Sequence, residues 1–236
     1  MAGFNGFKPS FFKFFRELSN NNNRPWFTEN KARYEDEVCA PLLGFIEEMR
    51  PRLNRVSKHY LAIPKKTGGS MFRIYRDVRF SKNKDPYKKN FSGGFSRATK
   101  ALRGGYYFHL QPGGNSMVGG GFWQPEASDL RRIREEIATD AAPLRQIINS
   151  ASFKKHFGEL EGQQLKTAPK GYPKDHPDID LLRYKSFIVS KYFTDEEVGT
   201  PGFAKEVLKY FKATRPFFDY MSEVLTTDGN GVSIID

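Results

Sequence analysis

Apolar residues near the start of the chain recur at the three- and four-residue spacing of a helix face. This pattern predicts a helix over 11–18, capped by Ser10, whose apolar face consists of Phe11, Phe12, Phe14, Phe15 and Leu18. A second helix is expected to open at Trp26-Phe27-Thr28 with Thr28 as its cap, and a further helical segment, 42–49, lies between Pro41 and Pro51. The first sixty residues are therefore expected to form a helical layer.

In the middle of the chain the period changes to the two-residue alternation of a strand. The pattern from Phe72 to Phe80 predicts a strand with Arg76 on its apolar face, and with Arg73 and Arg79 on the other. The segments 106–111 and 116–123 predict a hairpin joined by a Pro-Gly-Gly-Asn turn, and 183–189 predicts another strand. The glycine run 119–121 indicates a bulge or the close approach of another backbone or a ligand.

Helical patterns return after the hairpin. Helices are expected over 125–138, then up to about residue 150, around Phe153 and Phe157, from Thr200-Pro201 to Lys212, and from Pro216 to Leu225. The expected fold class is α+β: an antiparallel sheet of four or more strands, with N-terminal and C-terminal helices packed on it. We expect a single domain over 1–236, comprising a helical layer (1–60), a sheet-containing core (70–193) and C-terminal helices (200–226).

The composition fits a folded protein that remains in a reducing compartment. Hydrophobic residues make up 38% of the 236 residues, and the 22 Phe residues are expected to fill much of the core. The single cysteine, Cys39, excludes an intrachain disulfide and is expected to be a buried structural thiol. No apolar run approaches the ~18–20 residues of a spanning helix. The basic, amphipathic N-terminus lacks the continuous apolar stretch of a targeting peptide. We therefore expect a cytoplasmic protein without a membrane span; the sequence indicates no oligomeric state.

Positive charge is concentrated in one part of the chain. Between Arg73 and Arg103 stand ten Lys or Arg residues against two acids, Asp77 and Asp85, in a chain of formal net charge +11. Aromatic residues interleave with these cations, as in surfaces that stack bases while neutralising phosphates. The pattern favours binding of nucleic acid or a nucleotide, ahead of a small phosphorylated or carboxylated molecule. Purely structural charge remains the alternative.

Arg76 is the unusual cation, because burial on an apolar face requires a paired carboxylate or a ligand anion. A structural pair, for example with Asp180, and a functional anion site are both open. The lysines that follow, Lys82, Lys84, Lys88 and Lys89, stand on a loop with Tyr87. This loop is able to close over a phosphate, since Arg gives forked hydrogen bonds and Lys a point charge.

A weak metal-site pattern lies further on, at His176, Asp178 and Asp180. Alternate residues of an extended segment place a nitrogen and oxygens on one side, as a Mg²⁺ or Mn²⁺ centre needs. With Asp77 and a lysine nearby, metal-assisted phosphodiester hydrolysis would be the corresponding chemistry. Asp-Pro and His-Pro steps are also ordinary turn sequences, which weakens this interpretation.

Four blocks occur in a recognisable order: FFKFFRELSNNNNRPWFTENKARYEDEV, FRIYRDVRFSKNKDPYK, GGGFWQPE and LKTAPKGYPKDHPDIDLLRYKSF. Together they resemble a widespread family of uncharacterised bacterial and fungal proteins, a conserved domain of unknown function. The resemblance spans nearly the whole chain and implies a single-domain protein without supplying an activity. If the blocks mark a shared site, they add Gly119–Gly121, Gly171 and Tyr172 to the charged residues discussed here.

The sequence thus predicts a basic groove built from the stretches 73–89 and 170–185 that binds a phosphate-bearing partner. Its expected anion-binding residues are Arg73, Arg76, Arg79, Lys82, Tyr87, Lys88, Lys170 and Arg183. Asp77 and Asp180 are candidates for acid–base groups or ion-pair partners. The alternatives are a metal-assisted phosphoesterase or nuclease-like enzyme, and a structural or interaction protein whose charges pair internally.

Overall fold

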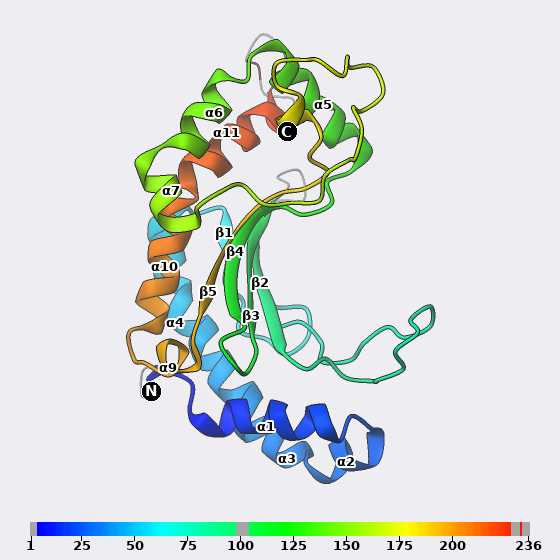
Figure 1. The fold of residues 1–236 in the computed structure, drawn as a ribbon. Helices are drawn as coiled ribbons and strands as arrows, with labels where there is room; N and C mark the ends of the chain where they lie inside the picture. Colours follow the sequence, from blue (N-terminus) through cyan, green and yellow to red (C-terminus); the bar gives the residue numbers. More distant parts are fainter. Residues whose placement is uncertain (1–3, 98–103, 228–231, 233–236) are drawn as a thin grey trace. The chain divides into compact units, whose positions relative to one another are not determined.

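The computed structural model describes residues 4–97, 104–227 and 232 of the chain (Figure 1). The chain folds into two compact units. The first comprises Met1–Ser96, Tyr106–Val118 and Tyr192–Lys209, and the second Arg97–Gly105, Gly119–Lys191 and Tyr210–Asp236. The single domain expected over 1–236 stays a prediction.

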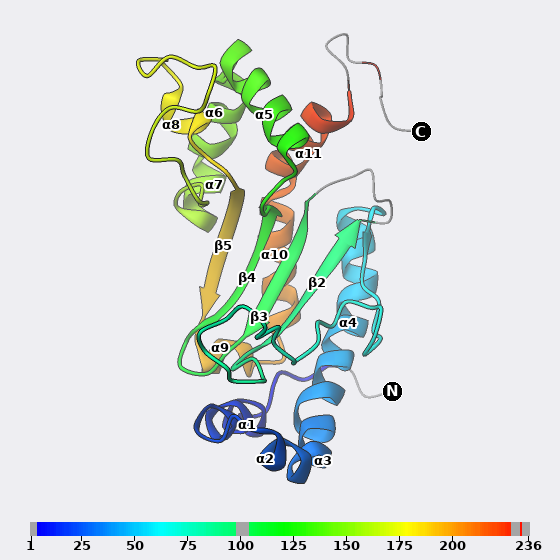
Figure 2. The ribbon, with the colours of Figure 1, turned by 90° about the vertical axis from the view of Figure 1, so that its right-hand side faces the viewer.

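The strands form one five-stranded antiparallel sheet in the order β1-β2-β3-β4-β5, and Figure 2 shows its long strands side by side. The strands are β1 (Tyr60–Leu61), β2 (Phe91–Arg97), β3 (Gly105–Leu110), β4 (Ser116–Phe122) and β5 (Phe187–Phe193). Helices precede and follow the sheet in the chain, so the α+β fold class is confirmed. The hairpin expected at 106–123 is present as β3 and β4.

The first helices of the first unit form where the apolar pattern predicts them, although their caps differ. They are α1 (Pro9–Asn20), α2 (Arg24–Glu29), α3 (Lys31–Arg33), the π-helical turn η1 (Tyr34–Cys39) and α4 (Ala40–Val56). Ser10 lies inside α1, because Pro9 takes its first turn, where a missing N–H costs nothing. Asn23 rather than Thr28 caps α2, accepting the Trp26 N–H at 3.0 Å.

Helix α4 runs through Pro51, so the end predicted there is wrong. Pro51 is exposed, while Met49, Leu53 and Val56 continue the buried face of the helix on either side of it. Packing of this face therefore outweighs the hydrogen bond that the proline removes.

Phenylalanine rings from distant parts of the chain fill the core of the first unit. The Phe45 ring lies 5.6 Å from that of Phe203 and 5.4 Å from that of Phe108, and Phe7 contacts both Phe45 and Phe203. Phe203 begins α10 (Phe203–Ala213). Cys39 is also buried, as expected, and burial raises the pKa of its thiol to about 11.

A single carboxylate, that of Asp195, joins its own helix to two other segments of this unit. Asp195, the first residue of α9 (Asp195–Val198), accepts the backbone N–H groups of Gly113 and Gly114 at 3.1 Å each. Arg16 of α1 donates to the same carboxylate at 3.3 Å. Both glycines have positive φ, +82° and +73°, which lets their N–H groups converge on one anion.

Two strand predictions need correction. The segment 72–80 is irregular, with only an isolated bridge at Tyr75↔Tyr87, and the strand next to β3 is formed by 91–97 instead. The expected alternation fails because Phe72 and Phe80, assigned to the apolar face, are 43% and 96% exposed. The strand expected at 183–189 begins only at Phe187, since α8 (Ile179–Leu182) and a turn precede it.

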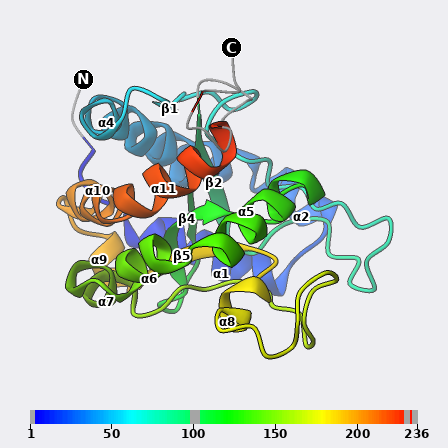
Figure 3. The ribbon, with the colours of Figure 1, turned by 90° about the horizontal axis from the view of Figure 1, so that it is seen from above.

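The second unit contains a cluster of helices that Figure 3 shows from above. They are α5 (Ala127–Thr139), α6 (Ala142–Asn149), α7 (Ala151–Phe157), α8 and α11 (Arg215–Thr226), and α11 packs on α5 and α6. Gly121 explains the glycine run in β4. A Cβ there would lie 2.2 Å from the Phe187 carbonyl oxygen, so the backbones of β4 and β5 approach closely, as one of the expectations held.

None of the helices in the described residues combines the length and the apolar character that crossing a membrane requires.

Candidate functional site

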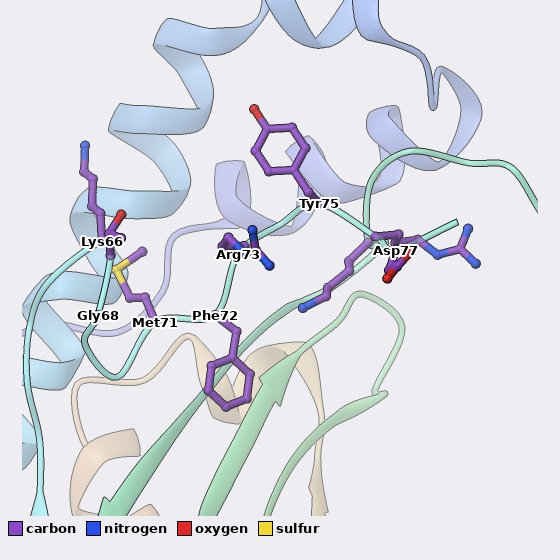
Figure 4. A pocket seen from close by; sticks show the side chains of 10 residues that line it. Lys66, Gly68, Met71, Phe72, Arg73, Tyr75 and Asp77 are labelled. Atoms are coloured by element: carbon purple, nitrogen blue, oxygen red, sulfur yellow. The ribbon is translucent and has the colours of Figure 1, made fainter. Parts of the chain in front are cut away.

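A pocket of about 810 Å³ lies on the first unit, over part of the predicted basic stretch (Figure 4). Its lining residues come from one continuous segment and one returning residue: Lys66, Thr67, Gly68, Met71, Phe72, Arg73, Tyr75, Arg76, Asp77 and Lys88. Four of these side chains are cationic and one is acidic. The first unit therefore builds a positively charged concavity by itself.

A tight turn over 63–70 presents the first lining residues. The Ile63 carbonyl oxygen accepts the N–H groups of Lys65 at 2.9 Å and Ser70 at 2.8 Å, while the Ser70 Oγ accepts the Ile63 N–H at 3.0 Å. Gly69 is required here, because a Cβ would lie 2.6 Å from the Ile63 oxygen. This turn was missed at the sequence level, although the run Lys-Lys-Thr-Gly-Gly carries both a turn signal and charge.

The other wall is a short antiparallel pairing that returns Lys88 to the pocket. The Arg76 N–H donates to the Pro86 carbonyl at 2.9 Å, and the Lys88 N–H donates to the Ile74 carbonyl at 2.8 Å. We call the intervening residues, 77–85, the basic loop; it belongs to the long teal segment beside β2 in Figure 1.

Arg76 stabilises the base of the basic loop through hydrogen bonds to uncharged oxygens and, among the described residues, does not form an ion pair there. Its guanidinium donates to the Asp85 carbonyl oxygen at 2.9 Å and to the Ser81 Oγ at 3.4 Å. Asp180 belongs to the second unit, where Arg145 binds it, so the pair suggested between Arg76 and Asp180 stays a prediction. Arg76 is nevertheless one of the lining residues of the pocket and is half-buried.

Tyr87, predicted to bind the anion, packs in the interior of the first unit instead of lining the pocket. Its ring is buried and stacks on Phe27 at 4.2 Å, and it is not among the lining residues. The aromatic side chains that do line the pocket are Phe72 and Tyr75, which are 43% and 59% exposed. In Figure 4 Phe72 points toward the strands and Tyr75 toward the N-terminal helices, with Arg73 between them.

Arg73 and Lys88 are the two pocket cations without a hydrogen-bonded acceptor in the described residues, although Arg73 lies near enough to Asp77 to lower the pKa of that carboxyl. Within the described residues, neither side chain has a hydrogen-bond acceptor or an ion-pair partner. Burial lowers the pKa of the Lys88 ammonium, and the nearby positive charge of Arg73 lowers it further. The Lys88 Nζ lies 5.9 Å from the centroid of the Phe72 ring. Two like charges are thus close enough to repel each other inside one pocket.

The other cations of this stretch, together with Lys66 before it, have partners of their own, lie outside the pocket or fall outside the described residues. Lys66 forms an ion pair with Glu35. Arg79 grips Asp77 with two hydrogen bonds, 3.0 and 2.7 Å, and these hydrogen bonds lower the Asp77 pKa. Lys82 is exposed on the basic loop, Lys84 donates to the Val78 carbonyl, and Lys89 pairs with Asp85. Lys100 and Arg103 lie outside the described residues.

The second predicted stretch belongs to the second unit. Lys170 is exposed, and Arg183 is half-buried with its Nε buried and without a hydrogen-bond partner. Neither lines the pocket, which the first unit forms alone. A groove shared by both stretches stays a prediction.

The candidate metal ligands are held by a guanidinium. Arg145 Nε donates to Asp178 at 2.7 Å, and its Nη2 donates to Asp180 at 2.7 Å. The His176 Nδ1 accepts the Asp178 backbone N–H at 3.0 Å. In the described part of the chain no three His, Cys, Asp or Glu side chains gather as a metal site would require. Arg145, which the sequence did not single out, balances both carboxylates.

Comparison with known proteins agrees with the four sequence blocks. Residues 10–220 match a family model described as conserved hypothetical protein (DUF2461). No curated protein and no solved structure matches the chain.

Proposed function

Since the chain belongs to the DUF2461 family of conserved hypothetical proteins, whose description assigns no activity, we propose its function from the pocket: the first unit binds a phosphate-bearing ligand between Arg73 and Lys88. The observation that carries this proposal is the pair of neighbouring cations without an acceptor. An anion between them removes their mutual repulsion and supplies the missing acceptors.

The two side chains suit a phosphoryl group. An Arg guanidinium gives two parallel hydrogen bonds to phosphate oxygens, and a Lys ammonium adds a compact charge. Asp77 at the rim does not oppose the anion fully, because Arg79 already binds its carboxylate. Lys66 and Arg76 add positive potential although they have partners of their own.

The aromatic lining favours a nucleic acid or nucleotide over a simple phosphorylated metabolite. Phe72 and Tyr75 expose ring surface in the same pocket, and a base supplies the flat apolar face that such rings stack against. The proposal places the protein in the cytoplasm, where a lone cysteine such as Cys39 stays reduced.

The direct test is binding of a fluorescent nucleotide or oligonucleotide to the intact chain at several salt concentrations. Arg73→Ala and Lys88→Ala are each expected to weaken binding about tenfold or more, because a hydrogen bond to a charged group contributes ~1.5–3 kcal/mol. Each is also expected to reduce the slope of log affinity against log salt by about one.

A matched control removes a cation of the same unit from outside the pocket. Lys13 on α1 is exposed, and its partner Glu17 keeps Arg33 as a second partner. Lys13→Ala is expected to leave affinity within about twofold of the wild type, since a charge outside the pocket acts on the ligand only through the screened field. If Arg73→Ala and Lys88→Ala melt like the wild type yet bind as the wild type does, the proposal is wrong.

A further inference from the structure

We propose that the ligand is a single-stranded nucleic acid, whose backbone passes from the Arg73–Lys88 pair onto the basic loop, where Phe80 stacks on an unpaired base. This inference rests on the proposed function and specifies its substrate class. It starts from Phe80, whose side chain is 96% exposed. A single exposed hydrophobic side chain is common on protein surfaces, so the inference depends on the charged residues beside Phe80 and on the pocket next to its loop.

The basic loop is built to hold that ring outward. Its backbone and side chains are joined by several short-range hydrogen bonds. Arg76 binds the Asp85 carbonyl, Asn83 accepts the Asp85 N–H at 2.8 Å, and the Lys84 ammonium donates to the Val78 carbonyl at 3.0 Å. A loop ordered before binding loses less entropy when its ligand arrives.

Phe80 on the loop and Phe72 in the pocket each have a cation beside the exposed ring. The Arg79 guanidinium carbon lies 5.9 Å from the Phe80 ring centroid, and the Lys88 Nζ lies 5.9 Å from that of Phe72. A nucleotide presents the complementary combination: a flat base, which stacks on an aromatic ring, and one sugar away a phosphate, which pairs with a cation. One ring–cation pair lies in the pocket and one on the loop that leaves it, which suits a strand that presents more than one base, although Arg79 also binds Asp77.

The geometry favours a single strand over a duplex. In a duplex the faces of the bases are covered by their stacked neighbours, so exposed rings meet base faces only when bases are unpaired. An anionic lipid surface would also attract a basic loop with an exposed Phe. Phe72 and Tyr75, however, line a concave pocket, which admits a base and not a bilayer.

The test compares a labelled oligothymidylate with a duplex of equal length, using the full chain and fluorescence anisotropy. Phe80→Ala is expected to weaken single-strand binding about five- to hundredfold, the effect of losing one stacked base, and Phe72→Ala is expected to act similarly. Duplex binding is expected to be weaker than single-strand binding and unchanged by Phe80→Ala.

Tyr192 provides the matched control, since it belongs to the same unit, is 56% exposed and does not line the pocket. Tyr192→Ala is expected to bind the oligothymidylate as the wild type does. Equal single-strand and duplex affinities, or no effect of Phe80→Ala, would overturn the inference. The proposed function would survive that result if Arg73→Ala still weakens nucleotide binding about tenfold or more. Phe80-dependent sedimentation with phosphatidylserine-rich vesicles, without oligonucleotide binding, would also overturn it in favour of a membrane surface.

Discussion

The side-chain amide of Asn22 pairs with the backbone of Tyr87 through two hydrogen bonds. Its Nδ2 donates to the Tyr87 carbonyl oxygen at 3.0 Å, and its Oδ1 accepts the Tyr87 N–H at 3.0 Å. Asn22 follows α1 in a run of four asparagines that the sequence marks only as a break between helices. This contact fixes the residue next to Lys88, and so links the N-terminal helices to the pocket.

Asn22→Ala is expected to lower the free energy of unfolding by about 1–3 kcal/mol, because it leaves a buried donor and acceptor of Tyr87 without partners. The Tyr87 amide should exchange faster with deuterium, and ligand affinity should fall as Lys88 loses its position. Asn21→Ala is the control: the Asn21 amide bonds only the exposed Glu17 carbonyl, so its loss should cost clearly less. Equal stability of the two variants would contradict this role for Asn22.

Ligand affinity at the pocket is expected to fall with rising pH, and to do so at a lower pH than the one at which an ordinary lysine loses its proton. Burial and Arg73 lower the pKa of Lys88, so its ammonium loses the proton, and the pocket loses a charge, below the usual lysine value of 10.5. Lys88→Arg should keep its affinity through the same range. Titration calorimetry in buffers of different ionisation enthalpy should show proton uptake on binding at alkaline pH. If the affinities of the wild type and Lys88→Arg fall in parallel with pH, titration of Lys88 does not cause the loss of binding.

The same shift has a definite sign for stability. The folded Lys88 releases its proton before the unfolded chain does, so the unfolded state holds more protons in the window between the two pKa values. The contribution of Lys88 to folding therefore becomes more favourable as pH rises through that window. A bound phosphate should remove this gain, because it favours the charged form.

Arg145→Ala is expected to destabilise the chain by about 1–2 kcal/mol, a value reduced by the partial exposure of the group. Burial opposes ionisation of Asp180, but the hydrogen bonds and charge of Arg145 outweigh it, and its pKa is lowered. The difference from the wild type should accordingly shrink as pH falls through that lowered pKa. Urea unfolding at neutral and acidic pH measures both effects. Lys13→Ala, which removes an exposed i,i+4 pair with Glu17, should cost only a few tenths of a kcal/mol.

Gly121→Ala is expected to cost about 3 kcal/mol or more, because its Cβ would lie 2.2 Å from the Phe187 carbonyl oxygen and φ is +140°. Gly158 offers the comparison within the same unit: φ is +74° there, but nothing lies within 4 Å of the added Cβ. Gly158→Ala should therefore cost less than Gly121→Ala, because only the backbone strain of φ +74°, ψ −83°, ~1–3 kcal/mol, opposes it. Similar melting temperatures for the two variants would show that the strands separate easily at this point.

The sequence predicted the elements whose conformation is determined by residues close to them in the chain. The β3–β4 hairpin follows from alternation plus a Pro-Gly-Gly-Asn turn, and α1 from its Phe spacing. Strand β2 was not predicted, and Gly93 and Gly94 weaken the local strand pattern there. Gly93 is glycine for a tertiary reason, since a Cβ would meet the Phe108 ring and the Ser70 carbonyl. Such distant contacts leave no local signal.

The candidate site, too, was predictable where it depends on nearby residues and not where it depends on distant contacts. The sequence located Arg73 and Lys88 because charge density is visible locally. It could not choose their partners: Arg145 binds Asp178 across 33 residues, and Asn22 binds Tyr87 across 65. The false strand at 72–80 has a related cause. Phe72 and Phe80 were assigned to a core by their type, whereas both are substantially exposed.

The interleaving of the two units along the chain governs when the first can fold. Its last segment, Tyr192–Lys209, supplies Phe203, on which Phe7 and Phe45 pack, and Asp195, which binds α1 and the β3–β4 turn. During translation the Phe-rich N-terminal helices therefore leave the ribosome long before these partners are synthesised. Nascent chains halted before residue 192 should present that apolar surface to chaperones.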